Sequence, residues 1–155
     1  MRTTTRYLTV LLLILFLFGS FHVFAEETLE PKKEPVAATD PERQKIEEKW
    51  GIQIKSVRLS AAGYMVDFRY HVTDSDKASA ILRRQQKAAL IDQDSGTELG
   101  VPRTRLGPMR QTAVKPAADR DYFIFFGNKN GVVKPGDKVT VVIGDFKLEN
   151  LVVEE

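Results

Sequence analysis

The chain has 155 residues, of which 43% are hydrophobic and 28% charged, a composition typical of one globular domain with accessory segments. It contains no cysteine, which excludes disulfides, thiolate nucleophiles and cysteine-ligated metals. Two of the 23 basic residues and none of the 21 acidic residues lie in the first 25 positions, so the remainder carries 21 of each sign. Charge therefore gives no argument for nucleic acid binding or for an anionic membrane surface.

Residues 1–25 have the pattern of a secretory signal peptide. Arg2 and Arg6 precede an apolar run, Leu8–Phe18, and small residues stand before a cleavage point after Ala25. The pattern predicts export, with a periplasmic or extracellular product. The alternative is an uncleaved N-terminal helix that anchors the protein, because this stretch is nearly long enough to cross a bilayer.

Residues 26–39 alternate charged residues with prolines and have little to bury, so we expect a disordered linker. The folded domain is then expected over residues 40–155. A short helix should open it, because Thr39 or Asp40 can cap its first turn and Gly51 can end it. Such a short helix must dock through Ile46 and Trp50, either to close an open end of the fold or to form part of a partner site.

The first strands follow this helix. Ile52 and Ile54 share one parity and Val57 and Leu59 the other, which predicts a bulge near residues 55–56. The next segment alternates strictly over ten residues, so a central strand is expected. Its inward set would be Tyr64, Val66, Phe68, Tyr70 and Val72, and its outward set Asp67, Arg69 and His71.

Turn residues divide the rest of the chain into further short strands. Residues 74–84 can form one or two helical turns, and residues 102–118 form a long loop. The remaining expected strands are Ala88–Asp92, Thr97–Val101, Tyr122–Phe126, Lys138–Ile143 and Phe146–Val153. With about seven strands and no βαβ spacing, the prediction is a mainly β, antiparallel sandwich of immunoglobulin-like kind.

Three strings carry a resemblance: LSAAGYMVDFRYHV, LIDQDSG and VKPGDKVTVVIGDFKLENLVV. They resemble a group of small exported bacterial β-domain proteins, over residues 46–153 of this chain. The resemblance implies export and a compact β domain. It brings no catalytic or binding residues with it.

Candidates for chemistry are few. His71 is the single histidine outside the leader, and a hydrolase would need it to act as a base for an exposed serine such as Ser95. Ser95 has no nucleophile-elbow sequence around it, so a solvated sheet face is the favoured interpretation of His71. Residues 92–98 alternate oxygen donors but lack the helices and the twelfth-position glutamate of a calcium loop. No metal or cofactor is expected.

A basic group offers a binding hypothesis. Arg103, Arg105, Arg110 and Lys115 occur in the long loop, and Arg83, Arg84 and Lys87 precede a strand. If the fold brings these side chains together, they can hold a carboxylate or phosphate. The alternative is that they are solvated charges on an exposed loop.

The segment YFIFF, residues 122–126, breaks the alternation expected of a two-sheet sandwich. Phe123 and Phe125 lie on the parity opposite to Tyr122, Ile124 and Phe126. Something should cover this second face, because exposed phenylalanines forgo burial energy and invite association. We expect the helix of Trp50 or the loop 102–118 to cover it. A partner chain, with Trp50, Phe123 and Phe125 as the interaction surface, is the alternative.

The sequence thus predicts a non-enzymatic exported binding module with an unidentified protein partner. Two alternatives stay open. One is an accessory protein that binds a small anionic ligand through the loop Arg103–Lys115, and the other is a hydrolase that uses His71.

Overall fold

The computed structural model describes residues 40–155; the expected signal peptide and linker, residues 1–39, lie outside this range. Two α-helices occur within it, α2 (Asp40–Trp50) and α3 (Ser75–Leu82), with a short 3-10 turn, η1 (Lys129–Gly131). The strands are β1 (Ile52–Ser60), β2 (Met65–Val72), β3 (Ala88–Asp92), β4 (Glu98–Gly100), β5 (Arg103–Thr104), β6 (Gly107–Pro108), β7 (Arg120–Gly127), β8 (Lys138–Ile143) and β9 (Phe146–Val152).

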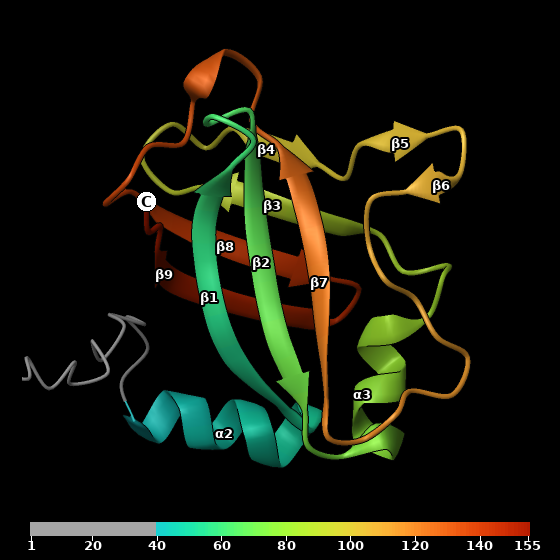
Figure 1. Cartoon of the computed structure of the whole chain (residues 1–155). Coiled ribbons are helices and arrows are strands. Elements are labelled where there is room, and N and C mark those ends of the chain that lie inside the picture. Colours follow the sequence, from blue (N-terminus) through green and yellow to red (C-terminus); the bar gives the residue numbers. More distant parts are fainter. Residues whose placement is uncertain (1–39) are drawn as a thin grey trace, which may run out of the picture. The chain divides into compact units, whose positions relative to one another are not determined.

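Seven of the nine strands form two antiparallel sheets that pack face to face (Figure 1). Sheet A has the order β1-β2-β7 and sheet B the order β4-β3-β8-β9, while β5 and β6 form a separate hairpin. The prediction of a mainly β, antiparallel sandwich is confirmed. The two additional strands are the short β5 and β6, which lie within the segment 102–118 that was expected to be only a loop.

The core lies between the inner faces of the two sheets. Val66, Phe68, Tyr70 and Val72 of β2 are fully buried, as the alternation predicted. They meet side chains of sheet B that are equally buried, including Leu90, Val141 and Phe146. The bulge in β1 is also confirmed, because the pairing of β1 with β2 shifts between Ile54 and Ser56 and leaves Lys55 unpaired.

Two residues of the central strand differ from the prediction. Tyr64, expected to point inward, lies in the β1–β2 turn and is 71% exposed. Asp67 does point outward but is buried, at 2% exposure, and its carboxylate lies against the guanidinium groups of Arg58 and Arg69. The parity of the strand was therefore correct, and the burial of these two residues was not.

Helices α2 and α3 close one end of the sandwich (Figure 1). Gly51 ends α2 with a φ of 63°, and its amide donates to Glu47 at 2.8 Å, as expected of a C-terminal glycine. Trp50 packs edge-on against Phe146 of β9 with ring centres 5.5 Å apart. The first interpretation of Trp50, that it closes an open end of the fold, agrees with this contact.

The segment after β6 runs along the outer edge of β7. The amide of Phe125 donates to Met109 and that of Gln111 donates to Phe123, at 2.9 and 3.1 Å. The loop thus satisfies the edge of β7 rather than lying over its face. Trp50 packs against Phe146 of β9, which belongs to sheet B, whereas Phe123 and Phe125 belong to β7 of sheet A. The expectation that the helix of Trp50 covers the two phenylalanines was therefore wrong.

Candidate functional site

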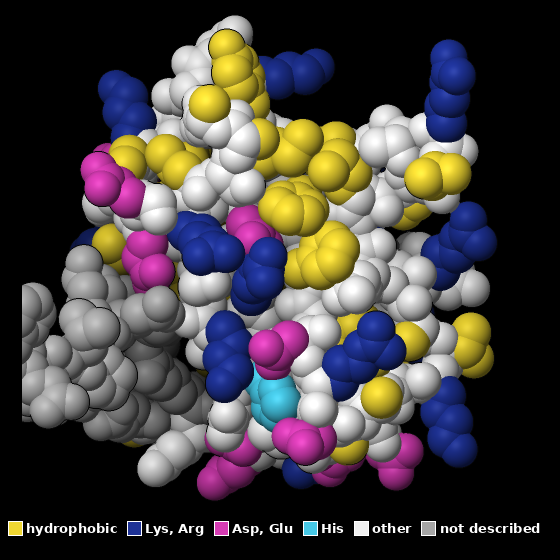
Figure 2. Space-filling model, viewed as in Figure 1, with side chains coloured by type: hydrophobic (Ala, Val, Ile, Leu, Met, Phe, Trp, Pro, Cys, Tyr) yellow, Lys and Arg dark blue, Asp and Glu magenta, His cyan; other side chains and the backbone are white. Residues whose placement is uncertain are grey.

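The outer face of sheet A combines aromatic and charged side chains. Figure 1 shows no helix or strand of the described residues in front of β1, β2 and β7. Figure 2 shows hydrophobic surface beside basic side chains on this face, with the histidine and acidic groups toward the end where α2 lies. We call this surface the outer face; its residues are Arg58, Met65, Asp67, Arg69, His71, Asp121, Phe123 and Phe125.

Phe123 and Phe125 form the apolar part of the outer face. Their rings contact each other, with centroids 5.2 Å apart and an interplanar angle of 56°. Cross-strand pairing places Arg69 opposite Phe123 and Asp67 opposite Phe125. Both phenylalanines are only partly buried, and the loop at Met109 and Gln111 pairs with the backbone at the edge of their strand.

An ionic cluster adjoins the two rings. Asp67 accepts from Nε of Arg69 at 2.8 Å and lies 3.8 Å from Nε of Arg58. The carboxylate is buried, whereas each arginine side chain is 45% exposed. Since two guanidinium groups share one carboxylate, the cluster presents a net positive charge to solvent beside the phenylalanines. The alternation of the sequence placed Asp67 and Arg69 on one face, but it could not reveal that Asp67 also pairs with Arg58.

His71 lies at the other end of the outer face, between two carboxylates. Its Nδ1 is 2.6 Å from Asp121 and its Nε2 is 3.2 Å from Asp119. Ser95 lies instead in the β3–β4 turn of sheet B, where its hydroxyl is bonded to Asp92 and Thr97. The fold thus places Ser95 and His71 in different sheets. Among residues 40–155, no group of three or more His, Asp or Glu side chains is arranged to hold a metal ion.

The predicted basic loop does not gather its charges at one point. Arg103 and Arg105 are exposed on the β5–β6 hairpin, and Lys115 is exposed further along. Arg110 turns inward, where its two terminal nitrogens donate to the carbonyls of Gln86 and Ile81 at 2.8 and 3.0 Å. Burial lowers the pKa of Arg110, and the neighbouring Tyr70 partly opposes this shift.

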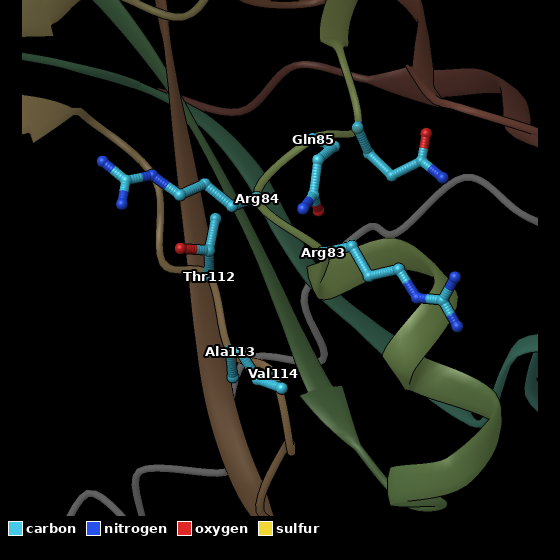
Figure 3. A pocket seen from close by; sticks show the side chains of 7 residues that line it. Arg83, Arg84, Gln85, Thr112, Ala113 and Val114 are labelled. Carbon is cyan, nitrogen blue, oxygen red and sulfur yellow. The ribbon is translucent and has the colours of Figure 1, made fainter.

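A depression of about 870 Å³ lies where the α3–β3 connection meets the segment 112–114. Arg83, Arg84 and Gln86 line one side of it, and Thr112, Ala113 and Val114 line the other. Figure 3 shows the side chains of Arg83 and Arg84 extending in opposite directions. The two charges that the sequence singled out here therefore do not converge on one ligand position.

The chain matches no family model, no curated protein and no solved structure. Within residues 40–155, neither helix has the length and apolar character needed to cross a bilayer.

Proposed function

We propose that this chain is a non-enzymatic binding module that engages a protein partner through the outer face of sheet A. The observation that supports the proposal is the pair Phe123 and Phe125, partly exposed on a face that the described elements leave open. Aromatic residues and arginine are the types most enriched at protein interfaces, and here both stand in adjacent positions of one sheet.

The partner surface that would complement this face carries an apolar side chain and at least one carboxylate. The apolar group would cover the two rings. The carboxylate would pair with Arg58 or Arg69, which share Asp67 as their acid. Binding of a small anion by the loop 103–115 is less favoured, because Arg110 already donates to two backbone carbonyls.

The fold class belongs to the same proposal. The chain passes β1 and β2 in one sheet, β3 and β4 in the other, returns with β7 and ends with β8 and β9. This connectivity supports an immunoglobulin-like assignment. Sandwiches of this kind commonly present interaction surfaces. Figure 1 shows the strands of sheet B crossing those of sheet A, whereas immunoglobulin sheets are more nearly aligned, so the assignment depends on connectivity alone. We also propose that residues 1–25 act as a signal peptide that directs export of the chain.

The test uses a photo-crosslinking residue at Phe125 in the full chain, expressed in its own cell. A matched probe at Lys147, an exposed position on sheet B, serves as the control. We expect a defined product from position 125, and the purified captured protein should bind the chain again. That binding should weaken at least about tenfold in an Arg58→Glu/Arg69→Glu variant and remain unchanged in Lys147→Glu.

Equal products from both positions, or rebinding that is insensitive to the two arginines, would count against the proposal. A product that contains a second copy of the chain would identify the partner as the protein itself.

A further inference from the structure

The β1–β2 turn presents an aromatic side chain that the strand pattern would bury. Tyr64 shares the parity of Val66 and Phe68, both fully buried, yet it is 71% exposed. The turn removes it from the core because the paired strands end at Ser60 and Met65. A tyrosine displaced from a core position into solvent is unexplained by packing.

The backbone around Tyr64 adopts conformations that alanine rarely accepts. Ala61 and Ala62 have φ values of 50° and 54°, and Gly63 continues with 84°. Alanine has no side-chain hydrogen bond to offset the steric cost of positive φ, and glycine or asparagine is the usual choice. Asn130, in the turn after β7, also has a positive φ of 63°. Such outliers concentrate at functional sites and persist where the surrounding structure imposes them.

Asn128 fixes these two turns to each other. Its side chain donates to the carbonyls of Gly63 and Val133 at 2.9 and 2.8 Å, and its Oδ1 accepts from the amide of Val133 at 3.0 Å. Its backbone amide also donates to the carbonyl of Tyr64 at 2.8 Å. Asn128 itself is 1% exposed. The strained turn is therefore held rigidly, and Tyr64 is presented from a fixed base.

A shallow depression of about 500 Å³ separates the two turns. Leu59 contributes apolar surface above the buried Val133, and Tyr64 also lines the depression. Asn130 and Lys134 add an amide and an ammonium group. In the part of the chain that the structure describes, no acidic side chain lines this depression and Lys134 makes no ion pair.

We propose that this depression binds a pyranose ring of a glycan, with Tyr64 as the stacking platform. One face of a pyranose is formed by C–H groups and suits an aromatic ring, while its hydroxyls accept from amide and ammonium donors. The volume falls within the range of small-ligand sites. The depression is built from the end of β1 and the segments that follow β1 and β7, and it shares no lining residue with the outer face.

The experiment is an amide-shift titration of the protein purified from cells that express the full chain. The probes are cellotriose, maltotriose and triacetylchitotriose, each added to about 10 mM because one stacked ring supports only millimolar affinity. We expect at least one probe to shift the amides of Gly63, Tyr64, Asn130 and Gly131. Tyr64→Ala should weaken this binding at least about tenfold, while Tyr64→Phe should retain it.

Leu106→Ala is the matched control, because Leu106 is fully exposed on the β5–β6 hairpin. It should leave the shifts unchanged, as should Phe125→Ser, which separates this site from the outer face. The proposal fails if none of the three probes shifts these amides, or if Tyr64→Ala binds as well as the wild type. It also fails if these amides respond only to a protein partner of the outer face.

Discussion

The guanidinium of Arg110 donates to the carbonyl of Ile81, 29 residues earlier in the chain, at 3.0 Å. Ile81 lies in the last turn of α3, and that turn contains no basic residue. A side chain from the loop that follows β6 therefore satisfies the carbonyl of Ile81 and places a positive charge at the negative end of the helix dipole. Arg110 joins α3 to that loop, and its role in the fold is that of a helix cap.

Replacing Arg110 with methionine should therefore lower the free energy of unfolding by about 2 kcal/mol or more, since the carbonyls of Ile81 and Gln86 lose their donor. Urea denaturation measures the change. Arg105→Met is the matched control, because Arg105 is exposed and should shift stability by less than about 0.5 kcal/mol. Equal effects of the two variants would contradict the capping role.

Tyr70 makes the free energy of unfolding depend on pH in the alkaline range. Burial raises the pKa of Tyr70 well above its ordinary value, with Arg110 opposing the shift and Tyr122 adding to it. Above pH of about 10 the unfolded chain loses this proton while the folded protein keeps it, so the stabilisation is present below that pH and is lost as pH rises further.

The variant Tyr70→Phe should accordingly lose less stability than the wild type between about pH 9 and pH 11. Near pH 7 it should be as stable or more stable, because the buried hydroxyl of Tyr70 finds no hydrogen-bond partner among the described residues. Unfolding midpoints measured across this pH range provide the comparison. A variant that falls as steeply as the wild type would assign the alkaline loss to other groups.

Gly51 is required for the junction of α2 and β1. Its φ is 63°, and a Cβ at this position would lie 2.6 Å from the carbonyl oxygen of Asp74. We expect Gly51→Ala to cost more than about 2 kcal/mol, from the unfavourable backbone conformation and this collision together. The control is Gly136→Ala, where φ is 91° but nothing lies within 4 Å of the added atom. Thermal or urea unfolding should show the larger loss for Gly51→Ala, and equal losses would exclude the collision as a cause.

Local patterns were sufficient to predict most of the fold. Alternation identified the inward face of β2, the parity change in β1 located its bulge, and Gly51 marked the end of α2. These features depend on neighbours within a few residues, which the sequence displays directly.

The candidate sites depended on contacts that the sequence does not display. Asp67 lies against Arg58 of the next strand, and Arg110 reaches inward to carbonyls of a helix formed much earlier. Neither pairing has a local signature, so the burial of Asp67 was missed and Arg110 was grouped with exposed arginines. Tyr64 was misplaced for a different reason: a turn with three successive positive φ values ended the alternation.

The strained turn gives a final prediction, because the same substitution should act oppositely at two alanines. Ala62 has a φ of 54°, where an L-residue is disfavoured by about 1–2 kcal/mol relative to glycine. Glycine adds chain entropy to the unfolded state, at a cost of about 0.5–1 kcal/mol. Ala62→Gly should therefore raise stability by up to about 1 kcal/mol. Ala80→Gly, within α3, should lower it by about 0.5–1 kcal/mol. Urea denaturation of both variants tests the difference in sign.

If Ala62→Gly also destabilises, the turn is not strained. If it stabilises and weakens binding of the trisaccharide probes, the strain in this turn serves to hold Tyr64 in its binding position.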